Sequence, residues 1–347
     1  MKSNESFFVT ERKNPTSFDV AKEAGVSQTT VSRVYNGKWQ GRIKESTLAK
    51  VLDAAERIGY APNALARGLI SKKTGIIGIV MSDTFNVFYS EVLNRLTNEF
   101  QRRNFKIMVF NTTPDHDMNQ ILNRMLEYQI DGIIVTSSAL TNQISGLWVD
   151  RGVPLVLLNT HSNNVKCNTV YCDNLGACRD VARYLCELGH RRIAYVSASN
   201  SLHKNHMMRQ NGFLLGLQEQ GIMDCQIVPG DYSYQSGKDA ADLLFGDAGT
   251  HPDAVFCAND RMAMGVMDAV RYQYGLSIPH DVSVIGFDDT EVASNDAYQL
   301  TTVRQQIDTV VQETVQLLLR NLENPEMKPQ TICLPMELVV RASSGPC

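Results

Sequence analysis

Residues 16–37, TSFDVAKEAGVSQTTVSRVYNG, have the pattern of two short helices joined by a tight corner. A side-chain oxygen of Thr16 or Ser17 can cap the first helix, and Gly25 stands where the chain must leave that helix with a positive φ. Ser27 is placed to cap the second helix. The apolar positions fall at helical spacing, with Val20, Ala21 and Ala24 in the first helix, Val26 in the corner, and Val31 and Val34 in the second. The segment predicts a helix-turn-helix unit.

The second helix of this unit presents polar groups on its outer side. They are Gln28, Thr29, Ser32, Arg33 and Asn36. Amide, hydroxyl and guanidinium groups of this kind read base edges in the major groove of DNA. The alternative is an αα-corner whose polar face is only solvated, because helix–glycine–helix units are common. A third amphipathic helix, closing at Gly59, would complete a small core with Leu48, Val51, Leu52, Ala55 and Ile58 turned inward.

From Thr74 onward, apolar runs rich in valine and isoleucine alternate with amphipathic segments of helical period. The predicted strands are 76–81, 106–110, 132–136, 153–158, 192–196, 254–258 and 282–287. The predicted helices are near 87–103, 116–129, 174–188, 206–220, 234–245, 260–273 and 306–322. Near-continuous apolar strands separated by helices indicate parallel sheets that are covered on both faces. The number of units predicts two such sheets in an α/β body.

The charge of the chain is divided unevenly between these two parts. Residues 1–75 hold 13 Lys and Arg against 7 Asp and Glu, a net +6, and the remainder holds 20 against 30, a net −10, which together give −4. A basic head on an acidic body suits a protein that binds DNA with one end only.

Three segments carry a resemblance to a known family. DVAKEAGVSQTTVSRVYNG, followed by GYAPNALARGL and by the C-terminal VRASS, resembles the lactose/galactose repressor family (LacI/GalR) of bacterial transcription regulators. The chain departs from the family pattern in the connection at 38–44, which is about two residues longer than usual, and at Val87, which replaces a proline.

The resemblance implies a domain order. We expect an arm at 1–15, an all-α helix-turn-helix headpiece at 16–60, a hinge helix or linker at 61–74, an effector-binding and dimerisation domain at 75–340, and a tail at 341–347. The large domain would resemble the two-lobed periplasmic sugar-binding proteins, with the chain crossing between lobes three times. Its N-lobe is expected at about 75–160 and 291–322, and its C-lobe at about 161–290 and 323–340.

The resemblance also implies the residues that contact DNA. Gln28, Thr29 and Arg33 would read bases, Ser27 and Thr30 would hold phosphates, and Thr16 and Asn36 complete the headpiece set. In the hinge, Leu69 would be wedged into the minor groove, with Asn63 and Ala66 facing it. An isolated helix this short is marginal in water, so the hinge is expected to fold only when docked. Inserting an apolar wedge kinks DNA, and the extra contacts offset the unstacking.

Polar and aromatic residues follow the ends of several predicted strands. Because ligands of parallel sheets bind outside the carboxyl ends of the strands, these residues are candidates for an effector site. They are Asp83, Phe85, Phe88, Tyr89, Asn159, Arg209, Tyr232, Asn259, Asp288 and Gln305. Amides, carboxylates and rings suit the hydroxyls and C–H faces of a sugar, and the same positions bind effectors in the family. Asn159 stands where an aspartate is common. Taken singly, an Asn or Asp after a strand is more often a helix cap than a ligand.

Other classes of protein are disfavoured. No apolar run approaches the length of a membrane span, and the N-terminus lacks the pattern of a secretory signal, so a cytoplasmic location is expected. The eight cysteines form no CxxC pair and the histidines no HxxxH pair, so neither a disulfide framework, a metal site nor a cofactor is expected. The segment GDYSYQSGKD has the wrong glycine spacing for a phosphate loop, and catalysis is not expected.

These observations predict a ligand-responsive, sequence-specific DNA-binding repressor of carbohydrate genes, released from a palindromic operator by a small sugar or related metabolite. A homodimer is expected, because a two-fold operator needs two headpieces and no leucine heptad follows the body. The alternatives are a solute-binding protein without DNA function, or a regulator that responds to a nucleobase or a protein co-regulator.

Overall fold

The computed structural model describes residues 15–37, 39–61, 73–81, 87–112, 118–136, 151–160, 166–198, 204–247, 249 and 251–347. The side chains of residues 118, 119, 122 and 204 are not among those described. The chain divides into two compact units, Met1–Thr74 and Gly75–Cys347.

The first unit is a bundle of three helices, α1 (Ser17–Ala24), α2 (Gln28–Tyr35) and α3 (Glu45–Arg57). The Val20, Val31, Val51 and Ala54 side chains are fully buried at its centre. The prediction that Leu52 turns inward is wrong, because its side chain is 47% exposed. Leu52 follows Val51 and is rotated by about 100° around the helix axis, and Ala54 lies on the buried side instead.

The predicted ends of the first two helices are confirmed. The Thr16 hydroxyl accepts from the Asp19 backbone N–H, and the Asp19 carboxylate accepts from the Thr16 N–H, which forms a capping box. Gly25 ends α1 in the left-handed region with φ 66°, and Val26 packs against the core from the corner. Ser27 caps α2 through the Thr30 N–H.

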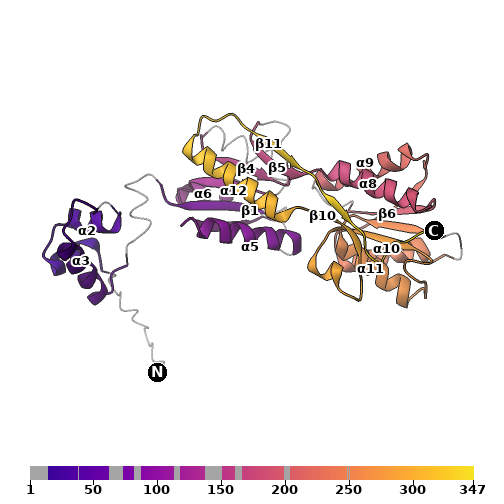
Figure 1. Ribbon diagram of the computed structural model, residues 1–347, viewed down its shortest axis with the longest axis horizontal. Coiled ribbons are helices and arrows are strands. Elements are labelled where there is room, and N and C mark those ends of the chain that lie inside the picture. Colours follow the sequence, from indigo (N-terminus) through magenta and orange to yellow (C-terminus); the bar gives the residue numbers. More distant parts are fainter. Residues whose placement is uncertain are drawn as a thin grey trace, which may run out of the picture. The chain divides into compact units, whose positions relative to one another are not determined.

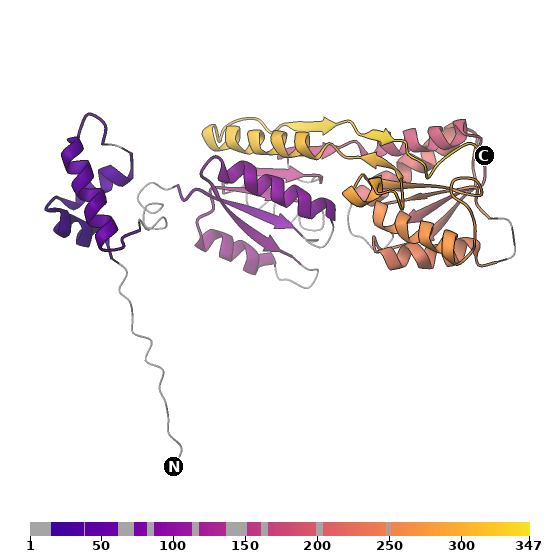
Figure 2. The same cartoon turned by 60° about the horizontal axis from the view of Figure 1, so that its bottom comes forward.

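The second unit contains two six-stranded sheets (Figure 1). The first has the order β11 (Thr331–Leu334), β5 (Asn168–Cys172), β4 (Leu155–Leu158), β3 (Gly132–Val135), β1 (Ile76–Met81) and β2 (Lys106–Asn111), all parallel. Helices α5 (Val87–Gln101) and α12 (Ile307–Glu323) pack on one face and α6 (Met118–Glu127) on the other (Figure 2). Alternate residues of β1 supply both faces, Ile77 and Ile79 on one side and Ile76 and Val80 on the other.

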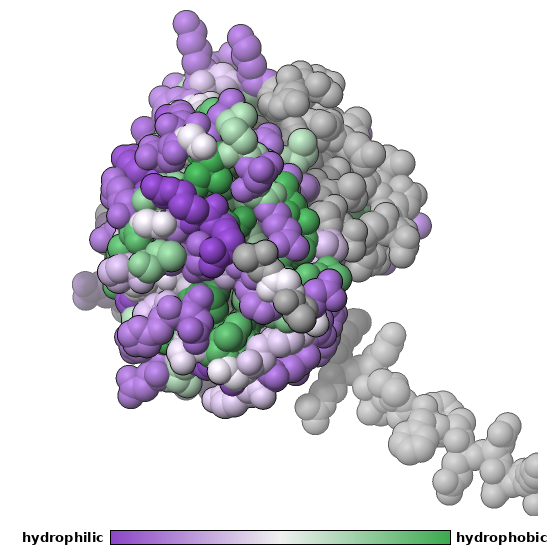
Figure 3. Space-filling model, turned by 90° about the vertical axis from the view of Figure 1, so that its right-hand side faces the viewer, coloured by the Kyte–Doolittle hydropathy of each residue, from purple (hydrophilic) through white to green (hydrophobic). Residues whose placement is uncertain are grey.

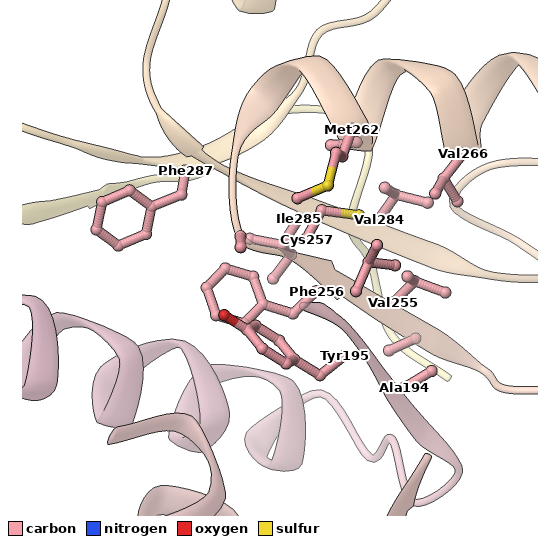
Figure 4. Close-up of a cluster of buried hydrophobic side chains, with 14 of the residues drawn as sticks. Ala194, Tyr195, Val255, Phe256, Cys257, Met262, Val266, Val284, Ile285 and Phe287 are labelled. Carbon is pink, nitrogen blue, oxygen red and sulfur yellow. The ribbon is translucent and has the colours of Figure 1, made fainter. Parts of the chain in front are cut away.

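The second sheet has the order β12 (Glu337–Val339), β10 (Thr301–Arg304), β9 (Ser283–Asp288), β8 (Ala254–Cys257), β6 (Ile193–Ser197) and β7 (Cys225–Pro229), with only β12 antiparallel. Helices α8 (Asn174–Glu187) and α9 (Lys204–Glu219) pair with each other, as do α10 (Tyr234–Phe245) and α11 (Asp260–Tyr272). In Figure 4 the rings of Tyr195 and Phe256 lie on one side of the strands, and Met262 and Val266 of α11 cover the other. A short 3-10 helix, η1 (Glu291–Ser294), follows β9.

The chain crosses between the sheets three times, near Asp173, Gln305 and Pro335. The predicted lobe limits are therefore wrong at three strands. β5, assigned to the C-lobe, belongs to the first sheet, as does β11, and β10, assigned to the N-lobe, belongs to the second sheet. All three strands lie beside a crossing, where local pattern does not say which sheet provides the hydrogen bonds.

The seven predicted strands and seven predicted helices of the body are present, each with ends within about two residues of the expected ones. Five strands were not predicted, namely β5, β7, β10, β11 and β12. They are three to five residues long, and most have polar residues or partly exposed side chains instead of a continuous apolar run. Among the described residues, no helix is both long and apolar enough to cross a membrane.

Candidate functional sites

The outer side of α2 is open to solvent as predicted. Gln28, Thr29, Ser32, Arg33 and Asn36 are all exposed. Two of them are oriented by side-chain hydrogen bonds: the Gln28 amide donates to the Ser17 hydroxyl at 3.1 Å, and the Asn36 amide donates to the Ser32 hydroxyl at 3.1 Å. The groups predicted to read bases thus lie on the exposed side of a helix whose opposite side is buried in the core.

Ser27 and Thr30, predicted to hold phosphates, first stabilise the helix. The Ser27 Oγ accepts from the Thr30 N–H at 3.2 Å and lies 2.9 Å from the Thr30 hydroxyl.

Ser27→Ala should destabilise α2 by about 1 kcal/mol, because one backbone donor loses its acceptor. Faster amide hydrogen exchange across α2 measures this effect. Thr29→Ala, at an exposed position in the first turn, is the control and should leave the exchange unchanged; equal acceleration in both variants would contradict the capping role.

Five of the predicted contact residues lie outside the described residues. They are Asn63, Ala66 and Leu69 of the hinge and Asp83 and Phe85 after β1. Their roles stay predictions.

Four predicted effector residues form one buried polar network. The Asn159 amide donates to the Gln305 side-chain oxygen at 2.9 Å, and the Gln305 amide donates to Asp288 Oδ1 at 2.6 Å. Arg209 Nη2 lies 3.5 Å from the same Asp288 oxygen. Asn159 follows a strand of the first sheet, Asp288 ends a strand of the second, and Gln305 lies at a crossing between them. The network therefore joins the two lobes.

Arg209 on α9 is only 6% exposed, and its guanidinium has protein partners on several sides. Its Nε donates to the Asn174 side-chain oxygen at 2.9 Å and its Nη1 to the Ala258 carbonyl at 2.5 Å. The guanidinium lies 3.6 Å from the centre of the Phe287 ring. Burial raises the pKa of the Asp288 carboxyl, and the charge of Arg209 opposes that rise.

A second buried carboxylate, Asp260, lies beside this network at the start of α11. It accepts from the Thr290 N–H at 2.7 Å, the Thr290 hydroxyl at 3.0 Å and the Thr302 hydroxyl at 2.5 Å. Burial, followed by the proximity of Asp288, raises its pKa to about 7. Asp260 ties α11 to the loop after β9 and to β10, next to the crossing at Gln305.

The remaining candidates are placed differently. Asn259 is the N-cap of α11 and accepts from the Met262 N–H, while its amide donates to the Tyr232 carbonyl at 3.2 Å. Tyr232 has φ 69° and is partly buried. Phe88 is 3% exposed in the core of the first lobe, so the structure does not bring its ring to the polar network. The partly buried Tyr89 packs against that core, with its ring edge-on to Phe88 at 5.2 Å.

Sequence reasoning missed two members of the network. Asn174 binds Arg209, and the Asn205 amide donates to the Asn159 carbonyl at 2.7 Å, linking α9 directly to the first lobe. Asn174 follows β5, a strand that was not predicted, so recognising that strand would have pointed to it. Nothing in the pattern around Asn205 indicated its role.

A helix-turn-helix unit with an exposed polar face, joined to a two-lobed α/β body with a buried polar network, defines a DNA-binding regulator of the ligand-responsive class. Comparison with known proteins agrees. The model of the lacI family of bacterial regulatory proteins matches residues 18–63, and that of the periplasmic binding protein-like domain matches residues 182–344. The chain is 35% identical over 334 residues to catabolite control protein A of Priestia megaterium, covering 95% of this chain and 99% of that one. It belongs to the lacI family and is a DNA-binding transcription regulator.

Solved structures show the same architecture over nearly the whole chain. The Lac repressor dimer bound to operator and the anti-inducer ONPF superimposes with a TM-score of 0.85 at 27% identity, covering 96% of this chain and all of that one. A complex of the transcriptional regulator CelR with cellobiose gives a TM-score of 0.70 at 27% identity, covering 95% of this chain and all of that one.

Proposed function

We propose that this regulator represses carbohydrate genes by binding a palindromic operator as a homodimer, and that a small sugar releases it from DNA. The exposed polar face of α2 supports operator reading, and the network that joins both lobes through Gln305 supports the response to a ligand. The Lac repressor is a dimer on its operator, and CelR holds cellobiose, which favours the same partners for this chain. No catalytic step is part of the proposal, and its place of action is the cytoplasm, where the operator lies.

The observation that carries the ligand response is the bond chain Asn159–Gln305–Asp288–Arg209. Each of these residues is less than 8% exposed, and the series of bonds ends at the ion pair of Asp288 and Arg209. A polyol that offers hydroxyls to these amides and charges would favour one arrangement of the lobes over another, because a ligand shifts an equilibrium only by its differential affinity for the two states. Effector and operator must then weaken each other's binding by the same factor.

Selection of binding sites from randomised duplexes tests the proposal, followed by titration of mono- and disaccharides against the selected duplex. Enrichment of a palindrome, with one class of sugar lowering operator affinity, supports it. Binding without a consensus and with a steep salt dependence would mean that the headpiece only attracts DNA phosphates non-specifically, and would overturn the operator claim. If a palindrome is found but nucleobases, and not sugars, release it, the effector class is wrong while the operator claim stands.

Arg33→Ala should weaken binding to the selected operator by about 10- to 100-fold, because a guanidinium that contacts a guanine is worth roughly 1–3 kcal/mol. The exposed Lys50 on α3 provides the control, and Lys50→Ala should change affinity much less. Competition between operator variants should show that Arg33→Ala tolerates substitution at one base position per half-site. A uniform loss across all duplexes would instead assign Arg33 to the phosphate backbone.

A further inference from the structure

The last residues of the chain are fastened to the second lobe and do not form a separate tail. Ser343 is 1% exposed, and the Gly345 N–H donates to the Ser283 hydroxyl at 3.1 Å. The Cys347 N–H donates to the Leu188 carbonyl at 3.0 Å. These bonds place Cys347 beside the turn between α8 and β6.

His190 lies in that turn and is 1% exposed. Its Nε2 lies 3.0 Å from the Gly345 carbonyl oxygen, and a carbonyl can only accept, so Nε2 carries the hydrogen. In the neutral ring, Nδ1 then holds a lone pair, and this buried atom has no hydrogen-bond partner. A backbone carbonyl that fixes the tautomer through one ring nitrogen is the usual support for a histidine that binds a metal through the other.

The side chain that faces Nδ1 is the carboxylate of Asp253, with Oδ1 at 3.3 Å. Backbone N–H groups orient this carboxylate, from Arg191 at 3.3 Å and from Arg192 at 3.1 Å. Arg192 Nη2 lies 3.8 Å from the other oxygen, Oδ2, and its side chain is 59% exposed. With the ring neutral, these two acceptors face each other at 3.3 Å and repel unless a proton or a metal ion lies between them.

The third member is Cys347, which is exposed. Its Sγ, a ring nitrogen of His190 and a carboxylate oxygen of Asp253 all lie within 4.8 Å of one another, and the described part of the chain holds one such group of three. A tetrahedral zinc site with bonds of about 2.0–2.1 Å to N and O has an N–O edge of about 3.3 Å. The observed separation of Nδ1 from Oδ1 matches that edge.

We propose that His190, Asp253 and Cys347 bind one divalent transition-metal ion of the zinc class. Imidazole, thiolate and carboxylate are the donors that zinc accepts in tetrahedral sites, and the exposure of Cys347 leaves the fourth position to water. The ion would join Cys347 to the α8–β6 turn and to the segment before β8, and so stabilise the second lobe.

Figure 3 views the end of the body that lies on the right in Figure 1, where the C-terminus is marked. Hydrophobic and hydrophilic residues are interspersed on that surface.

This site is independent of the operator and effector proposals, since it shares no residue with either. It was not predicted from spacing, because its three residues are 63 and 94 positions apart, as their numbers 190, 253 and 347 show.

The test uses the full reduced chain without a polyhistidine tag. Zinc affinity is measured by competition with a chromophoric chelator, and cobalt replaces zinc to reveal thiolate ligation through its near-ultraviolet charge-transfer band. Cys347→Ser is the first variant, because its side chain is exposed and the substitution should not disturb folding. Cys333→Ser is its matched control, since Cys333 is also exposed but lies on β11 in the other sheet. Asp253→Asn is the second variant.

Wild type and Cys333→Ser should each bind one zinc ion and show a higher Tm with zinc. With cobalt, both should show the thiolate charge-transfer band. Cys347→Ser should bind at least about tenfold more weakly and lose the band, and Asp253→Asn should weaken binding while keeping the band. Absence of binding by the wild type would overturn the proposal. Binding that is equal in Cys347→Ser, or lost in Cys333→Ser, would place the metal elsewhere and overturn it as well.

Discussion

Arg209→Met should lower the free energy of unfolding by about 3–5 kcal/mol, because it leaves the buried carboxylate of Asp288 without its cation. It also removes the donors that satisfy Asn174 and the Ala258 carbonyl. Methionine keeps the length of the side chain over the Phe287 ring, so most of the loss is electrostatic. Urea unfolding followed by circular dichroism measures it. The response to sugar should be lost in the same variant.

The control for this variant is another arginine with an ion pair. Arg179 pairs with Glu219 at 2.7 Å, but the two side chains are 41% and 43% exposed, so Arg179→Met should cost at most about 1 kcal/mol. A double variant, Arg209→Met with Asp288→Asn, should recover part of the stability because it removes the unpaired charge. Equal losses in Arg209→Met and Arg179→Met, or no recovery in the double variant, would show that the buried pair of Arg209 and Asp288 does not carry this stability.

Asp260 should make stability depend on pH. Burial, and then the neighbouring Asp288, raises the pKa of Asp260 to about 7 in the folded chain. An unfolded aspartate titrates near pH 4, so between about pH 4 and pH 7 the folded state holds one more proton than the unfolded state. The contribution is fully present below pH 4 and is lost as the pH rises through 7. Since a tenfold change in proton affinity is worth about 1.4 kcal/mol, a difference of about three between the two pKa values should make the loss roughly 4 kcal/mol.

Asp260→Asn tests this dependence, because asparagine resembles the protonated acid. Its carbonyl oxygen can accept from Thr290, and its amide can donate to the Thr302 hydroxyl, which turns to accept. The variant should match the wild type near pH 4 and exceed its stability at pH 8. Asp296→Asn, at an exposed position after η1, is the control and should follow the wild type at every pH. If Asp260→Asn were less stable than the wild type at pH 8, the three hydrogen-bond donors to Asp260 would stabilise its charged form more than burial disfavours it. The pKa of Asp260 would then be lowered and not raised.

Much of the fold could be predicted because its signals are local. The caps at Thr16 and Ser27, and Gly25 with positive φ, follow from the chemistry of helix ends. The apolar runs that became central strands are buried along their whole length, as at β1 and β9. Short strands with polar residues carried no such signal: β5 begins with Asn168, whose buried amide donates to Asn321 on a helix 153 residues away and accepts from the Gln330 N–H.

The candidate ligand site was predictable in part for a similar reason. Residues that follow parallel strands collect at one edge of a sheet, so Asn159 and Asp288 could be identified from the strand pattern. That rule also selected Phe88, whose ring lies in the core of the first lobe, because a ring after a strand can turn into the core as readily as toward a ligand. It missed Asn205, because a bond across two lobes leaves no local trace.

By itself, then, the sequence determined the helix-turn-helix unit, the alternation of strands and helices, and the family, since each depends on spacing along the chain. The tertiary structure alone decided which sheet receives β5, β10 and β11, and that Gln305 bridges Asn159 and Asp288. It also decided that His190, Asp253 and Cys347 meet. The physical reason is that periodicity specifies which side of an element is buried, whereas the partner it meets depends on how elements far apart in the chain close on one another.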